Sequence, residues 1–257
     1  MIKSSEIKKA ALNKLDWKQA FLASTLFVLA NFALNYALQF ADILTKNTPI
    51  FNLAANLIYL ALSIPLSFGL VSVMSKLYKS QKVSATTLFN DAILNFTKSI
   101  DIFLGIFCKI ILPSIVVIIA GLGILFITVQ NLPATTDNLE GYSLYIIFIS
   151  LVVLVCIALF AIPYALSSYI LADNKDLSSK EILNQSASLM KNEKWNFVKL
   201  IMSFFGYFIL LAVIVTIAGM AINKNVANIA NAIGLIILMP YVITSIRVFY
   251  EEVQDDK

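Results

Sequence analysis

Histidine is absent from this chain of 257 residues, and charged residues make up only 13% of it. Without imidazole, histidine metal ligands and histidine general bases are excluded. The two cysteines, Cys108 and Cys156, both fall inside apolar runs, where a free thiol is typically a small hydrophobic side chain rather than part of a disulfide. These shortages leave no complete catalytic or metal-binding set, so we predict a protein that is not an enzyme and carries no cofactor.

The chain is instead rich in apolar residues, which account for 60% of it, with a mean hydropathy of +0.86. Soluble domains of this size have about 45–50% apolar and about 25% charged residues. Too little polar material is therefore present to cover a water-facing surface. This composition excludes a soluble enzyme, a disordered chain and a secreted disulfide scaffold, and it predicts an integral membrane protein.

Six apolar runs are long enough to cross a bilayer, because a helix needs about 20 residues to span about 30 Å of hydrocarbon. The runs are Ala20–Phe40, Ile50–Met74, Ile102–Val129, Leu144–Leu171, Phe197–Ile222 and Ile229–Val248. They are continuous, whereas barrel strands alternate lipid-facing and lumen-facing residues. We therefore expect an all-α fold with six transmembrane helices in one polytopic domain, residues 1–257, and with an uncleaved first span.

The lysines predict the orientation of these spans. They gather in the N-terminal arm, the second and fourth connections and the tail, whereas the odd-numbered connections hold only Lys46 and Lys224. Basic residues flank spans on the cytoplasmic side. We expect a multi-pass protein of a bacterial cytoplasmic membrane with both termini in the cytoplasm. The net charge of +4 is scattered between spans, which indicates topology and no nucleic-acid partner.

The two long cytoplasmic connections share a pattern that predicts a capped helix in each. Ser84 and Ser178 each have an apolar residue directly before them and another four residues after them, which is the hydrophobic staple of a helix N-terminus. Ser178 with Glu181 also completes a capping box. We expect both to begin amphipathic helices along the inner membrane surface, with a weaker copy after Ser4 in the N-terminal arm.

Prolines recur in the three inward-running spans, each followed four residues later by a small residue: Pro65 and Gly69, Pro163 and Ser167, Pro240 and Thr244. The spacing predicts three tandem helical-hairpin repeats over residues 1–80, 81–175 and 176–250. Proline removes a backbone hydrogen bond and bends a helix. The kinks, together with Tyr164 and Tyr241, are a candidate groove or hinge for a lipid, a peptide or a partner helix; ordinary bends in a packed bundle are the alternative.

Lys109 is the one ionisable residue well inside a predicted span. Its run is too long for an untilted crossing at 1.5 Å per residue, so its ammonium can snorkel to the inner surface. The alternative is a counter-charge for a lipid phosphate.

Asparagines form two i, i+4 pairs in the outer half of the first two spans, Asn31 with Asn35 and Asn52 with Asn56. Such amides commonly form interhelical hydrogen bonds, and a polar ligand site is the alternative. No acidic residue lies within any predicted span, which disfavours proton-coupled or cation-coupled transport.

Several short motifs follow one another in the second half of the chain. They are Ile162-Pro163-Tyr164, Ala172-Asp173-Asn174, the segment from Ser186 to Lys194, Pro240-Tyr241 and Phe249-Tyr250-Glu251, and a lysine-rich arm with Trp17 precedes them. With them the chain resembles a bacterial six-span membrane family of unknown function, most clearly from Ser167 to Leu211. Tyr164 and Asn192 stand where that family has glycine.

The family is distantly similar to the membrane domain of some glycerophosphodiester phosphodiesterases, and its members have been linked to export systems and peptide self-protection. An all-helical bundle with surface-lying cytoplasmic helices and no reactive set of residues favours a non-enzymatic component that binds another membrane protein or a lipid. The resemblance implies that such an accessory component serves, for example, an export or peptide self-protection system. A small transporter or lipid-handling protein that uses the groove between proline-kinked helices is the alternative function.

Overall fold

The computed structural model describes residues 3–44, 48–131 and 138–255, and all secondary structure in these ranges is helical. Six helical segments are long and apolar enough to cross a membrane: Trp17–Ala41, Pro49–Tyr78, Phe96–Ile124, Ile147–Asp173, Lys194–Ala221 and Lys224–Asp255. Each overlaps one of the six predicted runs. The predicted class of all-α integral membrane protein is confirmed.

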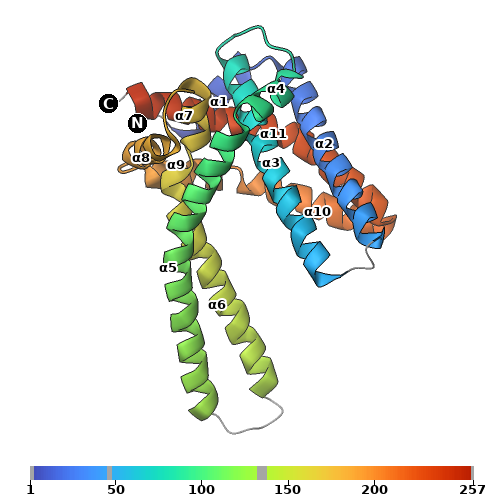
Figure 1. The fold of residues 1–257 in the computed structure, drawn as a ribbon, viewed down its shortest axis with the longest axis vertical. Coiled ribbons are helices and arrows are strands. Elements are labelled where there is room, and N and C mark those ends of the chain that lie inside the picture. The colour runs from blue at the N-terminus through green and yellow to red at the C-terminus, as the bar shows by residue number, and fades with distance from the viewer. Residues whose placement is uncertain (1–2, 45–47, 132–137, 256–257) are drawn as a thin grey trace.

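The elements are α1 (Ser4–Lys14), α2 (Trp17–Leu44), α3 (Pro49–Tyr78), α4 (Thr87–Leu94), α5 (Phe96–Asn131), α6 (Asn138–Ala161), η1 (Ile162–Tyr164), α7 (Ser167–Asp173), α8 (Ser179–Leu189), α9 (Lys194–Met202), α10 (Phe205–Ala221) and α11 (Lys224–Asp255). Helices α2, α3, α10 and α11 form one bundle, and α5 and α6 form a separate hairpin (Figure 1). The short helices gather at the end where both chain termini lie, which we call the terminal end; the opposite end is the distal end.

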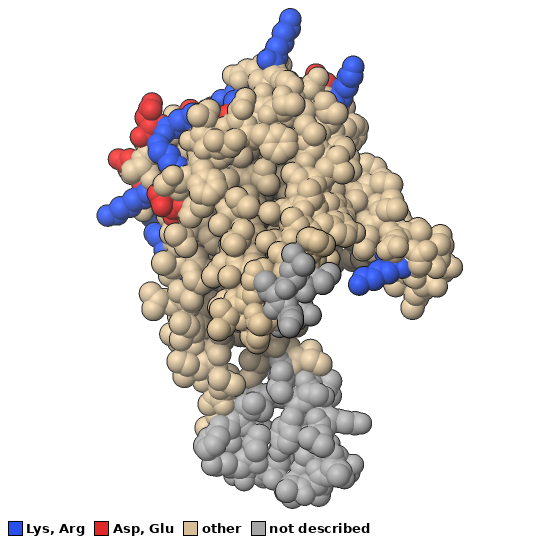
Figure 2. Space-filling model, turned by 45° about the vertical axis from the view of Figure 1, so that its right-hand side comes forward, with Lys and Arg blue, Asp and Glu red and all other residues tan. Residues whose placement is uncertain are grey.

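Charge is concentrated at the terminal end. Figure 2 shows blue and red side chains over the upper part of the molecule, above long sides that are almost entirely tan. Large apolar side chains are exposed along those sides, among them Leu112, Val116 and Ile119, whose exposed fractions are 70%, 66% and 64%. A surface of this kind is stable against lipid, because hydrocarbon solvates apolar side chains and water does not.

Each short helix at the start of a predicted unit packs on an inward-running span. Helix α4 packs on α3, α8 packs on α7, and α1 packs on α11 at the other end of the chain. The order of helices agrees with units at residues 1–80, 81–175 and 176–250, and the repeat itself stays a prediction.

Apolar side chains of these short helices are buried against other parts of the protein. Ile7 and Ala11 of α1, Leu88 of α4, and Ile182 and Leu189 of α8 are all buried. These helices are amphipathic, as predicted, and their position along the membrane surface stays a prediction.

Two of the predicted spans are broken. The span of Pro163 ends as an α-helix at Ala161, continues through η1 and resumes in α7, because a prolyl nitrogen cannot donate to the helix. In contrast, Pro65 and Pro240 lie inside the continuous helices α3 and α11, and Pro113, which the spacing argument left out, lies inside α5.

The fifth span divides between α9 and α10 at Ser203 and Phe204. The ammonium of Lys8 donates a hydrogen bond of 2.7 Å to the carbonyl of Ser203 and lies 4.3 Å from the centre of the Phe204 ring. Burial lowers the pKa of Lys8. A carbonyl freed at the break is thus satisfied by a cation from α1, as backbone groups near a membrane must be.

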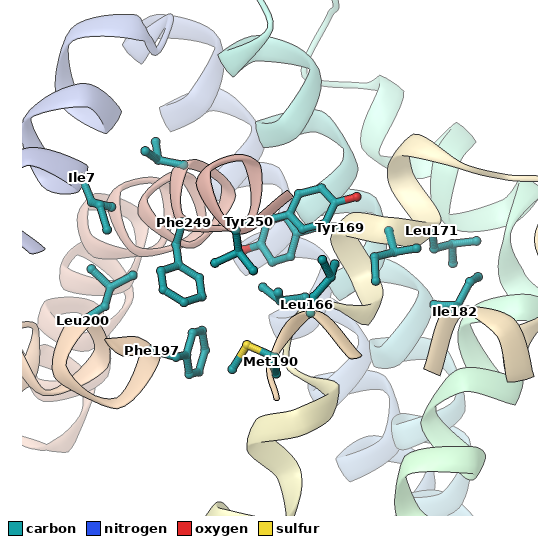
Figure 3. Close-up of a cluster of buried hydrophobic side chains, with 14 of the residues drawn as sticks. Ile7, Leu166, Tyr169, Leu171, Ile182, Met190, Phe197, Leu200, Phe249 and Tyr250 are labelled. Carbon is teal, nitrogen blue, oxygen red and sulfur yellow. The ribbon is translucent and has the colours of Figure 1, made fainter. Parts of the chain in front are cut away.

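The largest cluster of buried side chains among the described residues joins α1, α3, α5, α7, α8, α9 and α11, and Figure 3 shows part of it. Phe197 of α9 and Phe249 of α11 point toward each other with ring centres 5.5 Å apart, and Tyr169 stacks on Tyr250 at 6.2 Å. Each fully buried side chain of this size stabilises a fold by about 1.5–3 kcal/mol in water. The terminal end is therefore a packed base from which the long helices project.

Candidate functional site

The one arginine of the chain is almost completely buried in this base. Arg247 of α11 has 1% of its surface exposed, and its Nη2 donates a hydrogen bond of 2.9 Å to Glu251 one turn later. Its Nη1 lies 2.9 Å from an Asp173 oxygen as an ion pair, although the alignment is not that of a hydrogen bond. Arginine suits such a position, because its planar fork reaches two carboxylates at once.

Asp173 forms ion pairs with a cation from α11 and with one from the end of α3. It ends α7, and its Oδ1 accepts a hydrogen bond of 2.9 Å from Lys79, the residue that follows α3. Together with Arg247 this carboxylate ties α3, α7 and α11 at their terminal ends. The hydroxyl of Tyr169 adds a bond of 2.9 Å to the carbonyl of Ile243 in α11.

A second ionic cluster surrounds Asp91 of α4, which is buried. Ser72 donates a hydrogen bond of 2.7 Å to its carboxylate, Lys76 donates another, and the Nζ of Lys175 lies 3.5 Å away. Burial raises the pKa of the Asp91 carboxyl, but the bonds from Lys76 and Ser72 and the charge of Lys175 outweigh it, so the pKa lies below its usual value. Within the described ranges, no group of His, Cys, Asp or Glu could hold a metal ion.

The structure gives the proline-tyrosine pairs different neighbours. The carbonyl of Pro163 accepts a bond of 2.9 Å from Ser186 of α8. The ring of Tyr241, next to Pro240, contacts Phe204 edge-on with 5.2 Å between ring centres. Pro65 is buried in α3.

One groove does lie beside Pro65, between α3, α5 and α7, with a volume of about 300 Å³. Its polar lining consists of four serines, Ser63, Ser67, Ser99 and Ser168, among apolar side chains. None of the three singled-out prolines lines it, so it is not a groove shared by three kinks.

Lys109 and Tyr164 were singled out separately in the sequence, and the structure brings them together. The exposed Lys109 holds its ammonium 5.0 Å from the centre of the Tyr164 ring, a cation–π contact between α5 and η1. Its two alternative roles, snorkelling and pairing with a lipid phosphate, stay predictions.

The four predicted asparagines meet at the distal end of the bundle. Asn31 and Asn35 of α2 line a pocket of about 520 Å³ with Gln39 and Tyr59, and Asn35 also lines a smaller neighbouring pocket of about 330 Å³ with Asn52 and Asn56. The hydroxyl of Tyr59 donates to Asn31 Oδ1 at 3.3 Å, so an interhelical hydrogen bond links α3 to α2. Asn56 instead donates within its own helix, at 2.8 Å, to the carbonyl of Asn52.

The larger pocket has a third wall that sequence reasoning missed. Lys224, Asn225, Asn228 and Asn231 of α11 line it opposite α2. The last three are spaced three residues apart, which is close to one face of a helix. That spacing was the available signal, although it does not identify α2 as the facing helix.

The predicted caps have different outcomes. Ser178 is the N-cap of α8, its hydroxyl accepts the Glu181 amide at 3.3 Å, and the Glu181 carboxylate accepts from the Ser178 amide at 2.8 Å. Ser84 is not a cap, because α4 begins at Thr87 after a turn in which the Ser84 and Thr86 hydroxyls lie 3.0 Å apart. Ser84, the counterpart of Ser178, therefore lies in a turn before the helix and not at its start.

The whole chain, residues 1–257, matches the family described as "Protein of unknown function (DUF975)". The chain belongs to this family. This confirms the resemblance to a membrane family of unknown function. No curated protein and no solved structure matches the chain. The DUF975 assignment brings no activity with it, so a function has to be argued from the geometry.

Proposed function

We propose that this DUF975 member is a non-enzymatic accessory protein of a bacterial cytoplasmic membrane that binds a transmembrane helix of another protein along its α5–α6 hairpin. The observation that carries the proposal is the isolation of that hairpin. Helix α6 packs on α5 and η1, and α5 reaches α3 and α8 near its base (Figure 1). The candidate span Ile147–Asp173 has none of its most apolar window buried.

Exposed apolar side chains are stable against lipid, so by themselves they do not indicate a protein partner. The shape of the hairpin is the stronger support for one. Transmembrane helices associate through close packing and interhelical hydrogen bonds. The hairpin offers faces of α5 and α6 that the rest of the chain leaves free, and the groove at its base adds four serine hydroxyls within an apolar wall. A partner helix lying along α5 would reach this groove at its end.

Gly123 marks a place on α5 where a helix can approach closely. A Cβ built there meets nothing within 4 Å among the described residues, and the same is true of Gly206 in α10. A side chain added at either glycine therefore begins in open space. Gly123 lies on the hairpin, where we place the partner, and Gly206 does not.

The experiment is site-specific photocrosslinking in cells. A photoreactive side chain at Val116 or Ile119 should give a discrete protein adduct, and one at Val213 or Ile217 of α10 should not; all four positions are exposed. Gly123→Leu should weaken the adduct several-fold while Gly206→Leu leaves it unchanged. Lipid adducts alone at all four positions would overturn the proposal, and an adduct of twice the chain's mass would replace it with self-association.

The orientation forms part of the proposal. The ionic clusters, the lysine-rich α1 and both termini share the terminal end, which supports placing that end in the cytoplasm. A reporter fused after Lys257 should be active in the cytoplasm. Activity only outside the cell would reverse the orientation.

The serine-lined groove favours one second candidate, a small transporter or lipid-handling protein. Its apolar wall suits an acyl chain, and Lys109 beside Tyr164 offers a cation near the same hairpin base. This function predicts that Pro163→Ala or Lys109→Ala abolishes lipid or solute flux in reconstituted vesicles at unchanged expression. Normal flux in both variants would exclude it.

A further inference from the structure

The pocket at the distal end, formed by α2, α3 and α11, has a chemistry that neither the hairpin nor the groove explains. We propose that it binds the headgroup of an acidic glycerol-type phospholipid, that is, a phosphate with one negative charge joined to vicinal hydroxyls. The proposal is independent of the partner-binding function, because it concerns other helices and the opposite end of the bundle.

Amide side chains gather on the outward faces of the helices that form the pocket. Asn31 is half-buried, and Asn35, Gln39, Asn228 and Asn231 are exposed on helices that otherwise present apolar side chains. An amide held against apolar surroundings without a hydrogen-bond partner is unfavourable. The pocket is therefore stable only if it holds water or a polar group of another molecule.

The amides of the pocket have hydrogen-bonding capacity left over. Asn31 Nδ2 donates to the carbonyl of Phe27 at 2.9 Å, and Gln39 Nε2 donates to Asn35 Oδ1 at 2.6 Å. Each carboxamide has two N–H donors and one carbonyl acceptor, so these bonds occupy only part of the set. Asn228 and Asn231 make no side-chain hydrogen bond to any described residue. Paired donors and acceptors of this kind match hydroxyl groups, which also both donate and accept.

Positive charge lies at one side of the pocket. Lys224 begins α11, and Asn223 Oδ1 accepts the Val226 amide at 3.0 Å at that helix start. The positive end of the helix dipole and the lysine ammonium thus lie at the same side of the pocket, which favours an anion there. No acidic side chain is among the lining residues that the structure describes.

Aromatic residues that line the pocket support a position at the membrane surface. Phe32 and Tyr36 of α2 stack with ring centres 6.4 Å apart and line the pocket, and 64% of Tyr36 is exposed. Exposed tyrosines concentrate at the level of lipid headgroups. The volume of about 520 Å³ falls within the ordinary range for small-molecule sites, about 300–1,000 Å³.

These features together discriminate among headgroups. The amine of an ethanolamine headgroup would place a second cation near Lys224 and has no hydroxyl for the asparagines. Phosphatidic acid has the phosphate but lacks the diol. A glycerol headgroup supplies both groups, the phosphate for Lys224 and the diol for the amides of α2 and α11.

The experiment measures lipid retention by the full chain, for example by native mass spectrometry from mixed micelles. Phosphatidylglycerol should be retained about tenfold better than phosphatidylethanolamine, because only its diol can bond to the amides and two such neutral hydrogen bonds together are worth about that factor. The double variant Asn228→Leu with Asn231→Leu should lose about tenfold for phosphatidylglycerol, and Lys224→Gln should reduce its advantage over phosphatidylethanolamine.

Matched controls use exposed residues at the terminal end. Asn184→Leu and Lys180→Gln change the same residue types without touching the pocket and should retain phosphatidylglycerol as the unchanged chain does. Equal retention of the two lipids, or equal losses in pocket and control variants, would overturn the proposal. Phosphatidic acid bound as well as phosphatidylglycerol would overturn the assignment of the diol to the amides.

A competition experiment with a soluble phosphate distinguishes the two sources of this headgroup chemistry, the membrane lipid and the free headgroup. Glycerol 1-phosphate that displaces the lipid at millimolar concentration would show that the pocket takes the headgroup alone. Retention of the lipid against it would identify the membrane lipid as the ligand. Both results support the headgroup chemistry.

Discussion

Arg247 lies 2.9 Å from Asp173, and this pair joins the last helix to the segment that resumes after the break at Pro163. Lys79 reaches the same carboxylate from α3. Three spans that carry a proline therefore end on one acidic side chain. The relationship concerns residues distant in sequence, and it explains why the single arginine of the chain is buried rather than placed on the surface.

Replacement of Arg247 by methionine should destabilise the terminal end. The substitution keeps the apolar stem but leaves Asp173 with Lys79 alone and Glu251 without its partner. Breaking a buried ion pair from one side costs about 3–5 kcal/mol, and partial exposure of both carboxylates places the expected loss near the lower bound, about 3 kcal/mol. Thermal unfolding in detergent measures it. Lys180→Met, at an exposed site, is the control, and an equal loss in both would contradict the prediction.

The Asp91 cluster predicts a loss of stability in acid. Because the pKa of Asp91 lies below its usual value in the folded chain, the carboxylate stabilises the fold above the usual carboxyl pKa, about 3.9. That contribution is lost as the pH falls below about 4, when the carboxylate takes up a proton. Unfolding curves recorded between pH 3 and 7 should show a steeper decline for the unchanged chain than for Asp91→Asn. Parallel curves would show that Asp91 contributes nothing to this pH dependence.

Gly69 of α3 lies directly against the backbone of α4. A Cβ built there would lie 2.3 Å from the carbonyl oxygen of Leu88, a backbone atom that cannot move without displacing α4. Gly69→Ala should therefore destabilise the fold by about 1–3 kcal/mol, the usual cost of overpacking. Gly206→Ala, where the added Cβ meets open space, should be neutral or slightly stabilising because alanine favours helix. A neutral Gly69→Ala would mean that α4 is free to shift.

Ser178→Ala should cost about 1 kcal/mol, because the hydroxyl caps α8 and bonds to the Glu181 amide. Ser84→Ala is the matched control. Ser84 has a sequence context like that of Ser178 but lies outside α4. Ser84→Ala should therefore lower the free energy of unfolding by less than Ser178→Ala does. Hydrogen exchange of the first-turn amides of α8 and α4 compares the two. Equal deprotection would show that both serines act as caps.

The same local signal thus had two outcomes at Ser84 and Ser178, and the three matched prolines also had two outcomes. Pro163 breaks its span, whereas Pro65 and Pro240 lie in continuous helices. In each case a neighbouring element decides. Ser186 of α8 binds the carbonyl of Pro163, for example, and no periodicity along the chain specifies that partner.

The distal pocket shows the same division between sequence and structure. The i, i+4 spacing places Asn31 with Asn35 on one helix face, which is local geometry and predictable. That Asn228 and Asn231 line the opposite wall depends on which helices pack together, and the spacing of residues within α11 has no bearing on that choice.

Six long apolar helices and an all-helical fold were predictable from the sequence alone, because hydropathy sums over neighbouring residues and a bilayer admits few backbone structures. The meeting of Arg247 with Asp173, and of α2 amides with those of α11, was decided only by tertiary structure. Ion pairs and hydrogen bonds act over about 3 Å, and those distances are set by how whole helices pack.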